Sequence, residues 1–474
     1  MSFQIETNHK TCIGEGVLSV RNHVIAKYTG AGISTVNQHL SYSTPCAMSP
    51  SCILYENSSR TVFLIDIPTS ITLGQDLPHT ASPEPTTPTK KDGKRKHILS
   101  TPPLRAPYAS PPEPKTDKAR AQVLQRIPAL ERGFHAEIEP LVREGLREIR
   151  EGYGKGGGDS REWCLGRHVI DDMGAGSLMS QGNGDGDVTE TEDSRAYEQA
   201  LEDRDPPVIL SPTHANTFES ISGLRDVVVK NTSAQSAALV AGHPPCVFNI
   251  PPLSNFLLCT LSTSRAESGS DLIPGLPRDQ RFNLILLDPP WPNRSVRRSG
   301  HYHTQTYLDM DILTQQIGDI LRIHLLGMGG GQDEPIAAIW VTNASKSRKA
   351  AYDAIQSAGL SVCEEWVWIK TTTNGEPITP VDGLWRKPYE ILMIGKRNFQ
   401  SREGNITRRV IAAVPDVHSR KPGLKELFEK VFFSTSPAGY TALEVFARNL
   451  TAGWWACGNE VLKFTEEGWW VDDI

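Results

Sequence analysis

The stretch Leu284-Ile285-Leu286-Leu287-Asp288-Pro289-Pro290-Trp291 decides the fold class of this chain. Its first four residues are uninterrupted aliphatics, whereas a strand with one face in water would alternate apolar with polar residues. The run therefore predicts a short strand buried on both faces of a parallel sheet. Asp288 then lies at the carboxyl end of that strand, the edge of open α/β sheets where ligands bind.

The residues after this predicted strand combine hydrogen-bond acceptors with an aromatic surface. Pro289 and Pro290 have no backbone N–H, so they leave loop carbonyls without competing donors. An ionised Asp288 only accepts hydrogen bonds, and Trp291 offers a face on which a base can stack. The pattern favours the exocyclic amine of adenine, held next to a methyl donor. Asp-Pro-Pro after a strand is also an ordinary turn signal, so the downstream segments must decide.

Length and charge limit the possible classes. A chain of 474 residues is expected to hold two or more structured units with linkers between them. With 49 Lys and Arg against 55 Asp and Glu, the net charge is −6. Contact with nucleic acid therefore requires a local basic patch.

Cysteine usage and hydropathy point to a soluble intracellular protein. The eight cysteines contain no Cys-x-x-Cys pair, which favours reduced thiols and leads us to expect no metal site. We find no stretch approaching the roughly 20 apolar residues of a membrane span, and no signal-peptide pattern at the N-terminus.

Changes in composition predict five segments. Two β-rich runs, Cys52–Tyr55 and Thr61–Ile67, predict a hairpin that docks on a later part of the chain. Apolar residues at helical spacing between Leu130 and Ile149 predict a helical layer, with a stop at Gly152. The expected organisation is a β-containing segment at 1–71, a Pro/Ser/Thr-rich linker at 72–115, a helical segment at 116–172, a Gly-rich acidic linker at 173–206 and an α/β domain at 207–474.

Strand and helix patterns alternate through the last of these segments. Alternation of this kind calls for a doubly wound, mostly parallel sheet. Helices are expected over 310–321, over 345–358 and after Pro422. Strands are expected at 256–258, 284–287, 336–341, 366–369, 389–394, 410–414, 443–446, 454–457 and 461–464.

Three later segments place polar residues where they could join Asp288. His418–Gly423 sets cations before a predicted helix, and a lysine there suits a carboxylate. Leu443–Asn449 is an apolar strand with a polar end, and Gly458–Glu460 adds donors and acceptors suited to a ribose. Each of these segments alone is more often a helix cap or a turn.

Taken together, the motifs closely resemble the N(6)-adenine methyltransferase family that has the Asp-Pro-Pro-Trp signature. The resemblance covers roughly 248 to 464. It implies a Rossmann-like, S-adenosylmethionine-dependent methyltransferase of permuted order, with the catalytic loop preceding the donor-binding segment. The matching motifs are Asp288–Asn293, Trp340–Asn343, Glu365–Lys370, Lys387–Glu390, His418–Pro422, Glu444–Leu450 and Gly458–Phe464.

The resemblance also implies roles for individual residues. It implies a catalytic loop at the signature residues, and a donor site with Lys421 at the carboxylate and Arg448 and Glu460 at the ribose. The residues implied as catalytic are Asp288, Pro289, Pro290 and Trp291, and those implied at S-adenosylmethionine are Asn249, Ile250, Asp288, Lys421, Arg448, Asn449, Asn459 and Glu460. Lys387 is implied at the substrate.

A basic patch follows the signature directly. Six cationic or aromatic side chains lie within a dozen positions of it, and phosphate contacts would suit them. Arginine-rich surface loops are also common, so the position next to Asp288 is what favours nucleic acid. The residues are Arg294, Arg297, Arg298, His301, Tyr302 and His303. Lys346, Arg348 and Lys349 could extend the patch, and the adenine must be single-stranded or flipped out.

Three functional interpretations were weighed. The first is methylation of adenine N(6) in RNA, with (2′-O-methyl)adenosine of small nuclear RNA as the form the resemblance favours and DNA as the nearest alternative. The second is a catalytically silent scaffold, disfavoured because the signature is intact. The third is a Rossmann dehydrogenase, disfavoured because no Gly-x-Gly-x-x-Gly motif follows a strand.

Three further expectations concern the location of the protein, its tryptophans and its oligomeric state. The basic run Lys90–Lys96 fits a nuclear localisation signal or a solvated charge run, so a nuclear location is expected. The tryptophans at 366, 368, 454, 455, 469 and 470 are interpreted as packing anchors. A monomer is expected, with a partner subunit left open.

Overall fold

The structure is a computed structural model of the chain. The residues it describes all belong to one compact unit, Pro50–Ile474. They are 50–77, 96–109, 112–154, 161–170, 205–261, 271–292, 309–327, 334–384, 386–397, 406–434 and 439–472.

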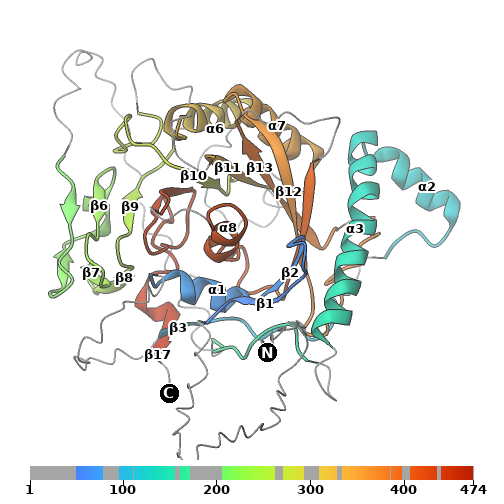
Figure 1. The fold of residues 1–474 in the computed structure, drawn as a ribbon, viewed down its shortest axis with the longest axis horizontal. Coiled ribbons are helices and arrows are strands. Elements are labelled where there is room, and N and C mark those ends of the chain that lie inside the picture. The colour runs from blue at the N-terminus through green and yellow to red at the C-terminus, as the bar shows by residue number, and fades with distance from the viewer. Residues whose placement is uncertain are drawn as a thin grey trace, which may run out of the picture. The chain divides into compact units, whose positions relative to one another are not determined.

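A twelve-stranded sheet organises this unit (Figure 1). Its strands follow the order β1-β2-β14-β12-β13-β11-β10-β15-β16-β9-β6-β4. Their bounds are β1 Ile53–Glu56, β2 Val62–Ile65, β4 Val208–Ile209, β6 Val228–Lys230, β9 Asn255–Leu258, β10 Leu284–Leu287, β11 Ile336–Val341, β12 Ser361–Lys370, β13 Tyr389–Lys396, β14 Thr407–Ala413, β15 Ala442–Val445 and β16 Trp455–Gly458.

Most neighbouring strands run parallel, which confirms the predicted fold class. The strands β11, β10, β15, β16 and β9 are parallel to one another, while β13 runs antiparallel to both β11 and β12. Every residue of β10 and β11 is buried, as expected for strands covered on both faces. The strand predicted at Val461–Phe464 is wrong, because these residues form turns in which the Lys463 N–H donates to the Glu460 carbonyl.

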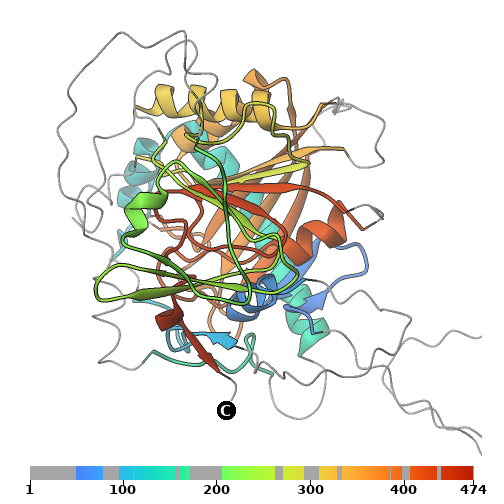
Figure 2. The same ribbon diagram turned by 90° about the vertical axis from the view of Figure 1, so that its left-hand side faces the viewer.

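The two faces of β10 belong to different hydrophobic clusters. Ile285 and Leu287 pack with helices α6 (Met310–His324) and α7 (Ser345–Ser357). Leu284 and Leu286 pack with α1 (Ile67–Gly74) and α8 (Lys425–Val431). Figure 2 shows α6 along one side of the strands and α1 on the other. Alternate side chains of a strand point to opposite faces, so this short run joins both halves of the core.

The N-terminal hairpin is an edge of the same sheet. The strands β1 and β2 pair antiparallel, and β2 pairs parallel with β14 through Val62 and Val410. This confirms the hairpin and its docking on a later part of the chain. An isolated hairpin is marginal in water, so the pairing with β14 explains why the hairpin is ordered.

Part of the predicted linker at 72–115 is structured. The helix α1 extends through Gly74, and β3 (Lys96–Ile98) pairs antiparallel with β17 (Trp470–Asp472), which follows the 3-10 helix η2 (Glu467–Trp469). Ile98 is 1% exposed, so the segment gains its order from long-range packing that composition does not report. The Pro-rich pattern predicts a linker because proline disfavours regular helices and strands. It does not report tertiary contacts, which order this segment.

The predicted helical layer consists of α2 (Asp117–Arg126) and α3 (Ala129–Tyr153). The buried side chains Ile138, Val142 and Ile149 of α3 pack against the hairpin and β14. The helix continues past the predicted stop at Gly152. Leu130, which was expected on the packed stripe, is 84% exposed.

A smaller sheet precedes β9. It has three strands in the order β5-β7-β8, with β5 at Asn216–Phe218, β7 at Ala237–Ala241 and β8 at Cys246–Ile250. The 3-10 helix η1 (Ile221–Leu224) follows β5.

The predicted tryptophan anchors lie in the core. Trp366, Trp368, Trp454 and Trp469 are each at most 4% exposed, and Trp366 stacks on Phe428 with ring centroids 5.2 Å apart. Among the described helices, none is long and apolar enough to cross a membrane.

The docked hairpin is expected to stabilise the whole unit. Leu64 in β2 is fully buried, so Leu64→Ala should lower the free energy of unfolding by about 2–5 kcal/mol. Leu130→Ala removes the same atoms from an exposed site and should change it by less than about 0.5 kcal/mol. Urea unfolding measures both, and equal effects of the two substitutions would contradict the packing described.

Candidate active site

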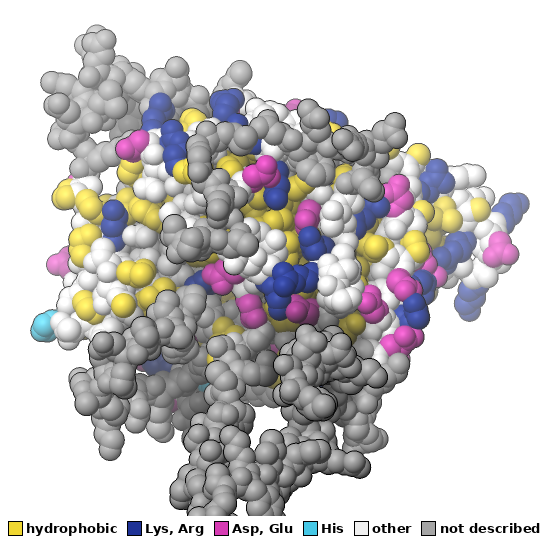
Figure 3. Space-filling model, in the orientation of Figure 1, with side chains coloured by type: hydrophobic (Ala, Val, Ile, Leu, Met, Phe, Trp, Pro, Cys, Tyr) yellow, Lys and Arg dark blue, Asp and Glu magenta, His cyan; other side chains and the backbone are white. Residues whose placement is uncertain are grey.

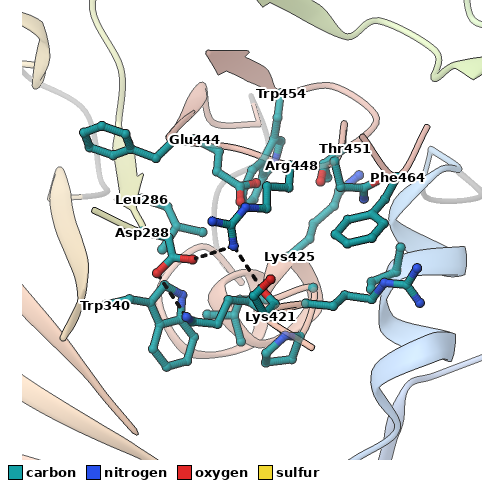
Figure 4. A pocket seen from close by; sticks show the side chains of 18 residues that line it. Leu286, Asp288, Trp340, Lys421, Lys425, Glu444, Arg448, Thr451, Trp454 and Phe464 are labelled. Carbon is teal, nitrogen blue, oxygen red and sulfur yellow. Dashed lines mark hydrogen bonds and ion pairs between the residues drawn. The ribbon is translucent and has the colours of Figure 1, made fainter. Parts of the chain in front are cut away.

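A pocket lies at the carboxyl ends of β10 and β15, against the loop that leads into α8 (Figure 4). It is lined by Ile71, Leu286, Asp288, Trp340, Ser419 to Lys425, Glu444, Phe446, Arg448, Asn449, Thr451, Trp454 and Phe464. The location is the one predicted from the buried strand and its terminal carboxylate.

Asp288 lies between two cations in this pocket, as Figure 4 shows. Its Oδ1 is 3.0 Å from the Lys421 Nζ, and its Oδ2 is 4.0 Å from the Arg448 NH1. The Asp288 N–H donates to the carbonyl of Val445, the last residue of β15. The parallel strands β10 and β15 therefore bring an acid and a cation from distant parts of the sequence to one place.

Lys421 also binds a second carboxylate, which the sequence analysis did not identify as a site residue. Its Nζ is 3.1 Å from the Glu390 Oε2, and Glu390 pairs with Lys370 at 2.5 Å. Burial acts to raise the pKa of Glu390, but Lys421 and Lys370 outweigh it and bring that pKa to about 2. Burial acts to lower the pKa of Lys421, yet Asp288 and Glu390 raise it, so Lys421 and Glu390 are both charged at neutral pH.

Arg448 extends the charge network toward the end of β16. Its Nε is 2.8 Å from the Glu460 Oε2, and its NH1 donates to the Ser419 carbonyl at 3.3 Å. Glu460 also pairs with Lys463 at 2.6 Å. The structure thus brings together four predicted site residues: Asp288, Lys421, Arg448 and Glu460.

Two backbone positions around the pocket have positive φ values, which residues other than glycine rarely adopt. Ser419 and Phe446 both line the pocket with positive φ, 64° and 60°. A Cβ at Gly458 would lie 3.2 Å from the Phe446 Cα, so glycine allows the end of β16 to approach this turn. Such strained residues are held in place by their surroundings and concentrate at functional sites.

Two further polar groups line the pocket, the Glu444 carboxyl group and the Asn449 amide. Burial, together with the nearby charge of Asp288, raises the pKa of Glu444 to about 8. The Asn449 Oδ1 is buried without a hydrogen-bond partner among the described residues. A bound polar ligand would satisfy such groups.

Trp291 does not offer the open ring face that the sequence suggested. Its side chain is 6% exposed within the core, and its Nε1–H donates to the Trp340 carbonyl at 2.7 Å. The Trp291 N–H donates to the Pro289 carbonyl at 2.8 Å, so one of the two expected loop acceptors is already engaged. Pro289 is buried and Pro290 is exposed. Trp291 therefore anchors the loop in this structure.

The other predicted residues that the structure describes do not line the pocket. The Asn249 N–H donates to the Thr465 carbonyl at 2.9 Å, while Ile250 is buried and Asn459 is exposed. The Lys387 amine donates to the Val381 carbonyl at 3.0 Å. The predicted loop residues Arg294, Arg297, Arg298, His301, Tyr302 and His303 lie outside the described residues.

Two observations bear on what the site could hold. Among the described residues, no group of three or more His, Cys, Asp or Glu side chains is arranged to hold a metal ion. The pocket instead offers cations, carboxylates and the Phe464 ring, a set suited to an organic ligand with charged and aromatic parts.

The doubly wound, mostly parallel sheet and the charged pocket at its carboxyl edge define a Rossmann-like fold of the class I methyltransferase type. The family model described as MT-A70 matches residues 282–460, which include β10, the signature loop and every cation of the pocket network except Lys463. The chain belongs to the MT-A70 family.

Three relatives illustrate this membership. The N6-methyladenosine RNA methyltransferase MTA1 of Pyricularia oryzae is 32% identical over 435 residues, 88% of this chain and 96% of that protein. The N(6)-adenine-specific methyltransferase METTL4 of Mus musculus, the member that the motifs resemble, is 32% identical over 257 residues, 52% of this chain and 49% of that protein. The DNA N6-methyl methyltransferase of Caenorhabditis elegans is 27% identical over 284 residues, 58% of this chain and 71% of that protein.

The raised pKa of Glu444 should appear in the pH dependence of stability. The folded protein holds the Glu444 proton up to about pH 8, whereas the unfolded chain releases it near 4.5, so stability falls as the pH rises through this window. Glu444→Gln does not titrate, so its stability relative to wild type should rise across the window, by at most about 1.4 kcal/mol per pH unit. Urea unfolding from pH 5 to pH 9 measures this, and a difference independent of pH would refute the environment described for Glu444.

Proposed function

We propose that this chain transfers a methyl group from S-adenosylmethionine to the exocyclic N(6) amine of adenine in RNA. The observation that supports this best is Asp288, an acceptor at the sheet edge inside the family signature, set between Lys421 and Arg448. Membership of the MT-A70 family supports the same reaction type.

The pocket fits the methyl donor chemically. S-adenosylmethionine, when bound, supplies a methyl group on a positively charged sulfur. Lys421 would hold its carboxylate, and Arg448 and Glu460 its ribose hydroxyls. The unpartnered amide oxygen of Asn449 is a further acceptor for an N–H or O–H of the ligand. Asp288 places a carboxylate in the pocket, which suits a cationic sulfonium.

Asp288 would orient the adenine amine and accept its hydrogen bond. A carboxylate has about four lone-pair sites, so Asp288 can bind Lys421 and an amine at the same time. An acceptor that draws an N–H out of the ring plane leaves the nitrogen lone pair free to attack. In the transfer, the bond from that nitrogen to the methyl carbon would form as the donor's carbon–sulfur bond breaks, the neutral thioether would leave, and one N–H proton would pass along the hydrogen bond to Asp288 and on to solvent.

RNA is preferred over DNA because the relative aligned over most of this chain bears the name of an RNA methyltransferase. The nematode relative is named for DNA, which keeps DNA as the second candidate. Within RNA, we propose (2′-O-methyl)adenosine of small nuclear RNA as the target, and a nuclear location because of the basic run Lys90–Lys96. These finer proposals rest on the sequence motifs.

The catalytic role of Asp288 is testable by one substitution. Asp288→Asn keeps the size of the side chain but replaces an acceptor oxygen with a donor NH2. We expect methyl transfer to fall at least about 100-fold, the scale seen when one stabilising group is lost. Mass spectrometry of nucleosides after incubation with matched RNA and DNA oligonucleotides measures this and identifies the substrate.

Asp319→Asn, on the outer surface of α6, is the matched control and should keep wild-type activity. Wild-type turnover by Asp288→Asn would remove Asp288 from the reaction. A wild-type enzyme that methylates the DNA oligonucleotide and not the RNA would favour the second candidate.

Donor binding is expected to depend on Lys421. Lys421→Ala removes the charge that faces the donor carboxylate and should raise the dissociation constant of S-adenosylmethionine at least about tenfold. Isothermal titration calorimetry measures the constant. Lys349→Ala, an exposed lysine of α7, is the control. Unchanged affinity in Lys421→Ala would place the donor carboxylate elsewhere.

A further inference from the structure

The accessory helices reach the same edge of the sheet as the pocket. The Glu131 carboxylate at the start of α3 accepts from the N–H of Ser345, the first residue of α7, at 3.4 Å. His135, one turn further along α3, lies 2.6 Å from the Tyr389 hydroxyl. Tyr389 begins β13 and adjoins Glu390, which binds Lys421 in the pocket. Successive residues of a strand point to opposite faces, so one strand separates α3 from the pocket.

Positive charge gathers where these helices meet. The segments 112–135, 344–349 and 386–387 contain ten Lys and Arg against three Asp and Glu, whereas the whole chain has 49 against 55. Figure 3 shows Lys and Arg side chains projecting where α2 lies. A chain with net negative charge therefore places a basic surface close to its pocket, as contact with a polyanion requires.

Three exposed cations of this region are not paired with a carboxylate among the described residues. Arg126, Arg132 and Lys346 are exposed, and none has a carboxylate within 4.0 Å among the described residues. Glu113 is engaged by Arg120 and by the Leu384 N–H. Surface cations without partners are available to bind phosphate.

The packing of α2 leaves its side chains open to a partner. None of its ten residues is buried, and Figure 1 shows the helix pointing away from the sheet beyond α3. An isolated helix of this length is only marginally stable in water. The packing of α2 gives little explanation for its stability. The positive charge of the region indicates a negatively charged partner.

The local field around His135 also suits an anion. Burial, together with the positive charges of Lys387 and Arg348, lowers the pKa of His135 to about 4. Arg348 lies 3.9 Å from the centroid of the Phe134 ring, which adds an aromatic surface to the cations. Cations interleaved with aromatic groups are the usual composition of single-stranded nucleic-acid sites.

We propose that Lys118, Arg126, Arg132 and Lys346, with Lys387 at the inner end, form a surface that binds phosphates of the RNA strand beside the target adenine. We call this set of residues the arm surface. The identification of its ligand as RNA rests on the proposed function. An adenine that enters the pocket must leave the base stack, so the strand next to it must be held by contacts of this kind. It also gives Lys387, which lies outside the pocket, a place at the substrate.

The test compares two triple variants of the full chain. The first replaces Arg126, Arg132 and Lys346 with Gln on the arm surface. The second replaces Arg60, Arg281 and Arg322 with Gln. Arg60 precedes β2, Arg281 precedes β10 and Arg322 ends α6 before β11, so all three lie at the opposite edge of the sheet. Both variants lose three positive charges, so their net charges are equal.

Binding of a labelled single-stranded RNA of about 20 nucleotides is measured by fluorescence anisotropy over a range of salt concentrations. The arm variant should bind at least about tenfold more weakly, and its salt slope should fall by about 2, because each phosphate contact to a single strand contributes about 0.7. KM for this RNA should rise with kcat unchanged, and methylation of a trinucleotide should be unaffected. The control variant should match wild type.

Equal binding and equal salt slopes in the arm variant and wild type would overturn the proposed surface. Equal weakening of RNA binding in both triple variants would also overturn the proposed surface. The loss would then follow from net charge and not from the position of the residues. Failure of the proposed function is distinguishable: a wild-type enzyme that methylates no adenine would refute that function, while the binding comparison would still decide whether the arm surface holds RNA.

Discussion

The charge bridge made by Lys421 is the constraint on which the pocket depends. Its ammonium joins Asp288 at the end of β10 to Glu390 at the start of β13, two strands separated by β11. The Trp340 ring of β11 lies 5.5 Å below the ammonium. Partly buried charges cost solvation energy unless they are paired, and removing Lys421 would take from Asp288 its nearest cation and leave Arg448 at 4.0 Å. The bridge therefore fixes the loop before α8 relative to three neighbouring strands, and with it the shape of the donor side of the pocket.

Residues from the N-terminal half of the chain bind that loop and hold it in place. Arg420, next to Lys421, pairs with Asp416 at 2.7 Å and donates to the Leu99 carbonyl at 2.8 Å. Arg167 donates to the Pro415 carbonyl at 2.9 Å. Both guanidinium groups are 1% exposed, so two arginines and one carboxylate are buried together. Backbone carbonyls near residues 99 and 415 supply part of the hydrogen bonding that such a cluster needs, while the Arg167 Nε and the Arg420 Nε and Nη2 have no partner among the described residues. The segments at 96–109 and 161–170 are thus part of the framework of the pocket.

The parts of this structure that could be predicted are those with a local signal. Uninterrupted aliphatic runs predicted β10 and β11 because burial on both faces leaves a pattern in consecutive residues. Asp288, Lys421, Arg448 and Glu460 were found because they lie in family motifs. Glu390 lay within such a motif, but nothing in its sequence neighbourhood indicated that its partner would come from residue 421. The order of residues 96–98 also depends on a strand near the C-terminus, so composition alone indicated a linker.

The start of β13 connects the chemistry of the pocket to the surface beside it. Tyr389 and Glu390 are consecutive, and they bind His135 on one face of the sheet and Lys421 on the other. These two consecutive residues therefore hold α3 and the Lys421 loop to the same end of β13. Tyr389 is 1% exposed, and burial raises the pKa of its hydroxyl, so this contact stays neutral while Glu390 stays charged. The start of β13 is thus held from both faces, by a neutral contact to α3 and by an ion pair to the loop before α8.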